Sequence, residues 1–201
     1  MSEIGNRGYA AEADALAVRY ESRSFAAVHP HLLALLPPPP AAVIDIGAGT
    51  GRDAGAVEAR GYRVTAVEPT AAMRAHGQRL HPSPAIAWID DHLPALAHVA
   101  PPTGGFAVLL LTAVWMHLDA EQRAAAMPRL GSLAAPGALL ALTLRHGPVP
   151  AGRRMFDVAT AETIALATAS GFDCIGVTEG DDGVALQPGI SWDRLVFRRR
   201  R

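Results

Sequence analysis

A glycine-rich segment that opens with a carboxylate is the first feature of the chain that could carry chemistry. Asp45 lies in a short apolar run, and Gly47, Gly49 and Gly51 follow at every second position. Such a turn lets backbone N–H groups and a helix N-terminus approach a ligand closely. A dinucleotide-binding turn would place its third glycine where Arg52 stands, and Asp45 suits an ammonium group better than a pyrophosphate. A tight turn without a ligand is the alternative.

Carboxylates stand at the ends of the next two apolar runs. Glu68 follows residues 62–67, and Asp90 and Asp91 follow residues 85–89. In an open α/β sheet, ligands bind at the carboxyl ends of the strands, where an acid after the second strand can accept both hydroxyls of a ribose. We therefore expect Glu68 to bind a ribose and one of the aspartates to bind an adenine amino group. The alternatives are a solvated helix start for Glu68 and helix capping for the aspartates.

Two histidines follow the fourth and fifth apolar runs at the same expected edge. Imidazole titrates near neutrality, so His117 and His146 are candidates for a general base beside an acceptor. A packing or helix-start role is the competing interpretation for His117. Arg145 either binds an acidic substrate or caps the sheet edge. The histidines show no metal-ligand spacing beyond His29-x-His31, so we expect no metal site.

From residue 41 onward, short apolar runs alternate with alanine-rich helical stretches. Continuous apolar runs suit strands buried on both faces, and strand–helix alternation predicts a parallel sheet. The last two runs have no helix between them, so an antiparallel hairpin is expected at the end. The expected strands are residues 41–46, 62–67, 85–89, 106–111, 138–144, 172–179 and 192–198. The expected helices are residues 8–20, 24–36, 51–60, 70–80, 93–99, 119–132 and 160–170.

Four consecutive prolines at residues 37–40 divide the chain. They cannot continue a helix or donate hydrogen bonds to a sheet, so they form a stiff connector. We expect residues 1–36 to form an N-terminal helical lid over a ligand-binding domain at residues 41–201. The alternative is that residues 1–36 pack on the far side of the sheet and serve stability alone.

Composition excludes several classes of protein. Half of the 201 residues are apolar and all 18 basic residues are arginine, so a buried core is possible and lysine chemistry is not. The net charge of −1 gives no general attraction to nucleic acid or to an anionic membrane. The single cysteine, Cys174, excludes an internal disulfide. The longest apolar run, residues 106–116, is too short to span a bilayer, and the N-terminus does not resemble a signal peptide. We expect a cytoplasmic protein.

In the order and spacing of these motifs the chain resembles the class I S-adenosylmethionine-dependent methyltransferases. VIDIGAGTGRDA at 43–54 looks like the first motif of that family, VEPTAAM at 67–73 the second, and WIDDHLP at 88–94 the third. FAVLLLTAVWMHL at 106–118 is similar to the motif on the fourth strand. The resemblance implies a Rossmann-like, doubly wound α/β fold whose seven-stranded sheet is mostly parallel with an antiparallel last strand. It also implies S-adenosyl-L-methionine as the cofactor.

The resemblance assigns roles to individual residues. Gly47 and Gly49 would pass under the methionine part of the cofactor, and Asp45 would orient that region. Glu68 would hold the ribose. The remaining cofactor-binding residues that it implies are Asp90 or, less directly, Asp91 at the adenine, Thr112 at the methionine end, and Tyr20 in the lid, where Tyr9 also matches the family.

The absence of Asn-Pro-Pro-Tyr and Asp-Pro-Pro-Tyr after the fourth run counts against amino-methylation of DNA bases or of protein glutamine. We therefore predict a methyltransferase that acts on a small-molecule acceptor, with no nucleic-acid or membrane partner. One alternative is a domain that binds S-adenosylmethionine as a sensor or scaffold without transfer. A nucleic-acid methyltransferase is another, and Arg52 disfavours a nicotinamide-dependent oxidoreductase.

Overall fold

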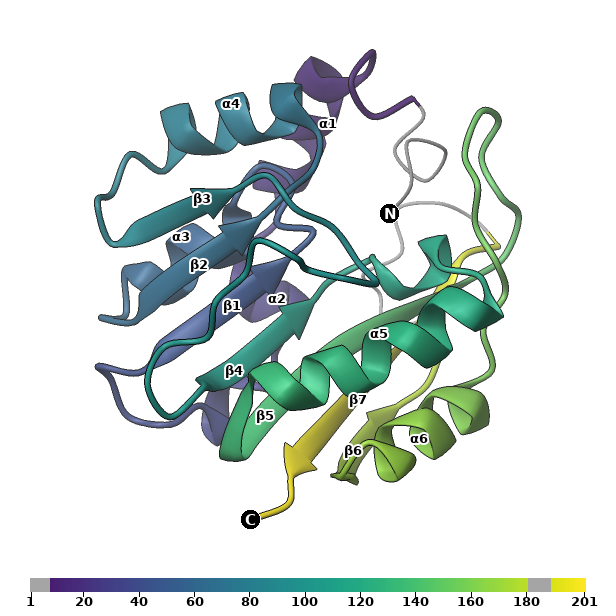
Figure 1. Ribbon diagram of the computed structural model, residues 1–201. Helices are drawn as coiled ribbons and strands as arrows, with labels where there is room; N and C mark the ends of the chain where they lie inside the picture. Colours follow the sequence, from purple (N-terminus) through teal and green to yellow (C-terminus); the bar gives the residue numbers. More distant parts are fainter. Residues whose placement is uncertain (1–7, 181–188) are drawn as a thin grey trace.

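The computed structural model describes residues 8–180 and 189–201, and its centre is a seven-stranded sheet with helices on both faces (Figure 1). The strand order is β3-β2-β1-β4-β5-β7-β6. The strands are β1 (Ala42–Ile46), β2 (Arg63–Val67), β3 (Ile86–Ile89), β4 (Phe106–Leu111), β5 (Ala134–His146), β6 (Phe172–Thr178) and β7 (Ser191–Arg199). Residues 181–188, between the last two strands, lie outside the described residues.

The first five strands are parallel. β1 pairs with β2 and β4, β2 pairs with β3, and β4 pairs with β5. β7 is antiparallel to both of its neighbours, β5 and β6. The expected Rossmann-like α/β fold, mostly parallel with an antiparallel last strand, is confirmed. The order places the carboxyl ends of β1, β2, β3 and β4 side by side, which is the edge that the sequence motifs occupy.

Neighbouring residues of one strand belong to different cores because successive side chains point to opposite faces of a sheet. Val43 packs with α2 (Phe25–Val28) and α3 (Arg52–Glu58) on one face. Ile44 packs with α5 (Ala120–Leu133) and α6 (Thr160–Ala169) on the other. The strands are thus buried on both faces, as their continuous apolar runs predict.

Helix α1 (Ala13–Glu21) lies beside α4 (Ala71–Leu80) at the edge where the first strands end (Figure 1). Ala13 and Leu16 pack against Met73 at the start of α4. The ring of Tyr20, which also belongs to α1, lies 3.7 Å from the position that a Cβ on Gly49 would occupy. Helix α1 therefore lies at the carboxyl edge of the sheet, whereas Phe25 of α2 and Leu32 belong to the core on one face of the sheet.

Three expected helices differ from the structure. The helix expected at residues 8–20 begins only at Ala13, and residues 8–12 form turns. Residues 24–36 form the short α2 and the 3-10 turn η1 (Leu33–Leu35), because Pro30 lacks an N–H and disfavours helical backbone at His29. Residues 93–99 form turns, and the carboxylate of Asp91 holds this loop by accepting from the backbone N–H groups of His92 and His98. The expected helices at 51–60, 70–80, 119–132 and 160–170 are present within one to two residues at each end.

Helix α5 begins where its sequence predicts a start. The Asp119 side chain accepts from the backbone N–H of Gln122, whose side chain accepts in return from the N–H of Asp119. This capping box satisfies N–H groups that the first turn of a helix leaves without partners. It fixes the 3-10 turn η2 (Trp115–His117) just before α5, at the ligand edge.

Across the described ranges 8–180 and 189–201, every helix is too short or too polar to cross a bilayer.

Candidate functional site

The glycine turn after β1 adopts backbone conformations that favour glycine. Gly47, Gly49 and Gly51 have φ values of +73°, +57° and +82°. A Cβ on Gly47 would collide with Cγ2 of Val114, so the turn packs directly against the chain that follows β4. A Cβ on Gly49 would make ordinary contact with the ring of Tyr20 at 3.7 Å. Gly47 therefore fixes the turn, whereas Gly49 faces the space beneath α1.

Glu68 connects the end of β2 to the glycine turn. Its Oε2 accepts from the Gly49 N–H at 2.9 Å and its Oε1 accepts from the Thr70 N–H at 2.8 Å. The side chain is buried, and burial raises its pKa, although hydrogen bonds from the Thr70 N–H, the Thr70 side chain and the Gly49 N–H lower it. A carboxylate has about four acceptor sites, so this group retains capacity to accept from a ligand hydroxyl.

Asp45 has a buried oxygen without a partner. The residue is 2% exposed, and its Oδ2 has no hydrogen-bond partner among the described residues. Burial first, and then repulsion from Asp53, raise its pKa well above the usual range. A buried polar atom without a partner is costly, so the atom is suited to a ligand that donates to it, such as an ammonium group.

The two aspartates after β3 have separate surroundings. Asp90 is largely exposed and its Oδ2 lies 2.8 Å from the guanidinium of Arg74. Asp91 is buried and both of its oxygens accept from backbone N–H groups of the following loop. Asp90 is thus held by an ion pair at an exposed position, where a ligand could reach it, whereas Asp91 already has a structural role.

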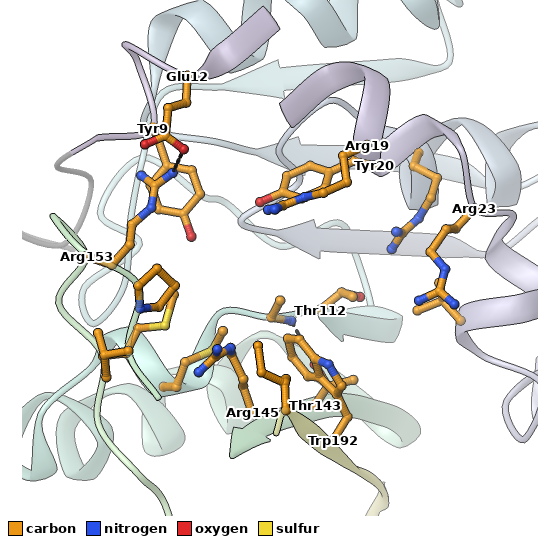
Figure 2. Close-up of a pocket in the computed structure, with 18 of the residues that line it drawn as sticks. Tyr9, Glu12, Arg19, Tyr20, Arg23, Thr112, Thr143, Arg145, Arg153 and Trp192 are labelled. Atoms are coloured by element: carbon orange, nitrogen blue, oxygen red, sulfur yellow. Dashed lines mark hydrogen bonds and ion pairs between the residues drawn. The ribbon is translucent and has the colours of Figure 1, made fainter. Parts of the chain in front are cut away.

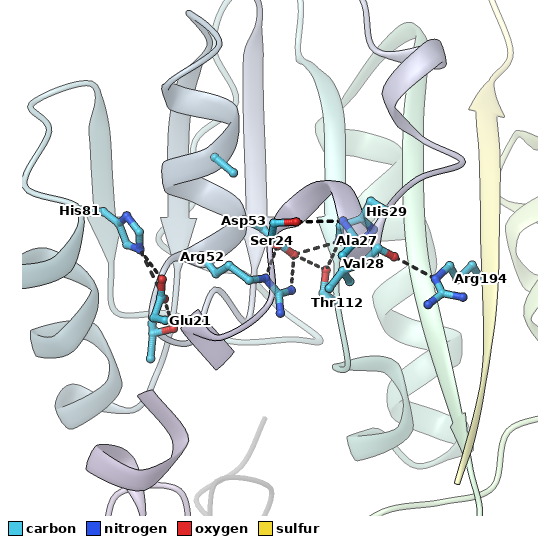
Figure 3. Close-up of polar contacts among 12 residues, drawn as sticks. Glu21, Ser24, Ala27, Val28, His29, Arg52, Asp53, His81, Thr112 and Arg194 are labelled. Atoms are coloured by element: carbon cyan, nitrogen blue, oxygen red, sulfur yellow. Dashed lines mark hydrogen bonds and ion pairs between the residues drawn. The ribbon is translucent and has the colours of Figure 1, made fainter. Parts of the chain in front are cut away.

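Thr112, directly after β4, belongs to a buried polar network (Figure 3). Its hydroxyl donates to Asp53 Oδ2 at 2.7 Å, and His29 Nε2 lies 3.0 Å from the same oxygen. Arg52 binds Asp53 through two nitrogens, at 2.7 and 3.0 Å. Burial raises the pKa of Asp53, but the hydrogen bond and charge of His29, followed by Arg52, outweigh it and lower the pKa overall. The network joins α2, α3 and β4 beneath the site.

Two cavities lie side by side at this edge of the sheet. The smaller, about 110 Å³, is lined by Asp45, Gly47, Gly49, Glu68 and their neighbours. The larger, about 500 Å³, lies between α1 and the ends of β5 and β7 (Figure 2). Both are lined by Tyr9, Tyr20, Arg52, Thr112 and Ala113. The expected cofactor residues thus gather around one cavity, except Asp90 and Asp91, which line neither.

His117 lines the smaller cavity and pairs with Tyr9. Its Nδ1 lies 2.9 Å from the carbonyl oxygen of Arg154, which can only accept, so Nδ1 carries the hydrogen. Nε2 then accepts from the Tyr9 hydroxyl at 3.0 Å. Burial lowers the pKa of His117, which favours this neutral form. The imidazole therefore has a defined tautomer with its basic nitrogen facing the site.

His146 has a different environment. It is not among the described residues that line the two cavities. Its Nδ1 lies 2.8 Å from Asp157 and its Nε2 lies 3.1 Å from Asp193. Burial lowers its pKa, but the hydrogen bond with Asp157 and the attraction of Asp193 outweigh burial and raise the pKa overall. This arrangement favours a charged imidazolium that links β5, β7 and the loop between β5 and α6.

His146→Gln should change how stability depends on pH. Because the folded-state pKa is raised, the ion pairs stabilise the fold fully below the ordinary histidine pKa of about 6.5 and lose that effect as pH rises through the folded-state pKa. We expect a loss of about 0.5–1 kcal/mol at pH 6 and a smaller one at pH 9. Thermal unfolding of His146→Gln and Asp157→Asn at both values checks this, and an equal loss at pH 6 and pH 9 would contradict it.

Gly49 and Gly61 form a matched pair for testing the glycine turn. Both have positive φ, +57° and +93°, and a Cβ on either would make ordinary contacts. Alanine at either position should cost about 1 kcal/mol of stability. Only Gly49→Ala should also weaken cofactor binding, and Gly49→Val should abolish it, because Gly49 faces the cavity. Calorimetry on the folded variants checks this; normal binding by Gly49→Val would contradict the role of the turn.

The sequence interpretation missed several residues that shape the site. Asp53 forms ion pairs with its neighbour Arg52 and with His29. The second pair depends on tertiary packing between distant segments of the chain. Trp192 and Arg194 line the larger cavity together because residues two apart on a strand share a face. Alternation along the last strand was the signal that could have found them.

A family model described as "Methyltransferase domain" matches residues 18–174. No protein with a curated description matches the sequence significantly.

Solved structures of methyltransferases share the fold. A protein of Methanosarcina mazei described as a SAM-dependent methyltransferase aligns with a TM-score of 0.72 and 13% identity, covering 85% of this chain and 97% of its own. The 1,6-didemethyltoxoflavin-N1-methyltransferase of Burkholderia thailandensis aligns at 0.67 and 20% identity, covering 95% and 81%. The magnesium protoporphyrin IX methyltransferase of Synechocystis aligns at 0.66 and 18% identity, covering 96% and 80%.

Proposed function

The chain belongs to the methyltransferase domain family, and on that premise we propose that it transfers a methyl group from S-adenosylmethionine to a small-molecule acceptor. The larger cavity carries the proposal. Its volume of about 500 Å³ lies within the range of small-molecule sites, and it adjoins the glycine turn through shared walls. The Burkholderia and Synechocystis proteins, which share the fold, are named for small-molecule acceptors.

The residues around the smaller cavity fit S-adenosylmethionine. Glu68 has free lone pairs for ribose hydroxyls, and the buried Oδ2 of Asp45 lacks a donor that an amino group would supply. Gly49 leaves room for the methionine portion. We further propose that Asp90 meets the adenine amino group in preference to Asp91, because the Asp90 side chain is largely exposed whereas that of Asp91 is buried and holds the following loop.

The cofactor's sulfonium supplies an activated methyl group, so the protein's task is alignment and exclusion of water. Thr112 is fixed by Asp53 at the junction of the two cavities, where donor and acceptor would meet. We propose His117 as the general base for an acceptor that must lose a proton. Before the acceptor binds, the Tyr9 hydroxyl donates to the basic Nε2 of His117, and the acceptor would take the place of this hydroxyl. For His146, the other candidate base, we propose a structural role instead: it links β5 and β7 to the loop between β5 and α6.

Of the lid expected at residues 1–36, we propose that residues 8–23 form the movable part, because Phe25 and Leu32 belong to the buried core. A cavity of about 110 Å³ is smaller than sites that bind drug-sized molecules, and the Tyr20 ring lies 3.7 Å from the position that a Cβ on Gly49 would occupy. Cofactor entry would therefore require α1 to move away from the glycine turn and then to close again.

Transfer of an isotope-labelled methyl group tests the proposed function. The purified protein is incubated with labelled S-adenosylmethionine and with separate metabolite, protein and nucleic-acid fractions. Label in the metabolite fraction is the expected result. Label in nucleic acid alone would favour the nucleic-acid alternative. Cofactor binding without transfer to any fraction would favour a sensor or scaffold domain.

A further inference from the structure

The larger cavity carries an excess of positive charge. Among the described residues that line it, six are arginines and one, Glu12, is acidic. Glu12 forms an ion pair with Arg153 at 2.7 Å, and Asp53 forms an ion pair with Arg52 at 2.7 Å, so the charges of these two arginines are balanced. The chain as a whole has a net charge of −1, so this concentration of arginine in one cavity is local and not a consequence of composition.

Arg145 is a buried arginine of this cavity whose charge is not balanced by a carboxylate among the described residues. The residue is 7% exposed, and its guanidinium donates to two backbone carbonyls, Gly147 at 3.3 Å and Pro148 at 2.8 Å. No carboxylate of the described residues pairs with it. Burial lowers the pKa of its guanidinium, and the Tyr9 side chain offsets this in part. Buried charges in proteins are normally paired, so a cation in this position is suited to an anionic ligand.

The strand register places an apolar surface beside this charge. β5 and β7 are antiparallel, and Arg145 is directly opposite Trp192. Both side chains line the same wall of the cavity, with Tyr9 and Tyr20 on the opposite wall (Figure 2). Other apolar lining residues are Met116, Pro148, Val149, Pro150, Met155 and Ile190. A ligand that fills the cavity would thus meet apolar walls beside the buried guanidinium of Arg145.

We propose that the methyl acceptor is a small carboxylate carried on an apolar, ring-sized body, and that Arg145 binds the carboxylate while Trp192 packs against the body. This inference rests on the proposed function and specifies its substrate class. A guanidinium offers two parallel donors that match a carboxylate in geometry. The Arg145 donors that the two carbonyls leave unused would supply them.

Matched pairs of acids and amides test the proposal. The probes are benzoate, 3-phenylpropionate and indole-3-acetate, each compared with its uncharged amide, and binding is measured by calorimetry on protein saturated with S-adenosylhomocysteine. At least one acid should bind about tenfold or more tightly than its amide. Arg145→Gln should abolish that preference, and Arg145→Lys should restore part of it.

Arg63→Gln is the control. Arg63 is exposed at the first position of β2, at the edge of the sheet opposite to the cavities, so this substitution should leave the preference for the acid unchanged. Equal affinity for acids and amides, or no binding of any acid, would overturn the proposal while intact binding of S-adenosylhomocysteine left the proposed function standing. Failure of the wild-type protein to bind S-adenosylhomocysteine would overturn the proposed function and this inference with it. The comparison of acid with amide on the wild-type protein does not depend on how well any variant folds.

Discussion

Glu68→Gln should weaken S-adenosylmethionine binding by about 1.5–3 kcal/mol, or roughly 10- to 150-fold in Kd. The carboxylate accepts from Gly49 and Thr70, and we propose that it also accepts from the ribose. An amide has one acceptor oxygen instead of two and would place an NH₂ group against one of these donors. The loss therefore combines a weaker ribose contact with a less well-fixed glycine turn.

Calorimetric titration of the folded variant measures this effect. Glu58→Gln is a suitable control. Glu58 is the last residue of α3, its carboxylate accepts a hydrogen bond from the Ser83 hydroxyl, and it lines neither cavity. Equal affinity of Glu68→Gln and wild type, with circular dichroism showing an intact fold, would remove the ribose assignment.

Deletion of residues 1–23 should leave a folded domain that binds S-adenosylmethionine about tenfold more weakly and loses methyl transfer. The two large cores include none of the described residues 8–23, so the sheet and its main helices should form without them. The cofactor site would lose Tyr9 and Tyr20, and water would enter the cavity that α1 now covers.

Tyr20→Ala separates a lid from a merely stabilising segment. It removes the ring over Gly49 while leaving the contacts of Ala13 and Leu16 with Met73 in place. A lid predicts faster cofactor association and dissociation in stopped-flow measurements, with little change in melting temperature. A lower melting temperature with unchanged cofactor kinetics and affinity, in both the variant and the truncation, would show that the segment serves stability alone.

Local signals in the sequence were sufficient to predict the sheet and the glycine turn. Strands such as residues 106–111 are apolar without interruption, because both faces of the sheet are covered. Gly47 and Gly49 occupy positive-φ positions that few other residues adopt, so their spacing carries structural information. The fold class, the first motif and the position of Glu68 directly after β2 depend on such short-range patterns.

Contacts between distant segments could not be predicted in the same way. The helix expected at 93–99 is replaced by a loop that Asp91 holds, and the propensity of alanine and leucine for helix gave no sign of it. His146 and His117 look alike in the sequence, yet one lies between two aspartates and the other lies in the cavity with Tyr9. The opposition of Arg145 and Trp192 follows from the register of β5 and β7, which depends on how the whole sheet assembles.

A crystal structure of the protein with S-adenosylhomocysteine tests the central claim most directly. The account predicts the ribose hydroxyls on Glu68, the amino group within hydrogen-bond distance of Asp45 or the adjoining turn, and the sulfur facing the larger cavity near Thr112. Binding at another place, or a sulfur that faces away from that cavity, would contradict the account.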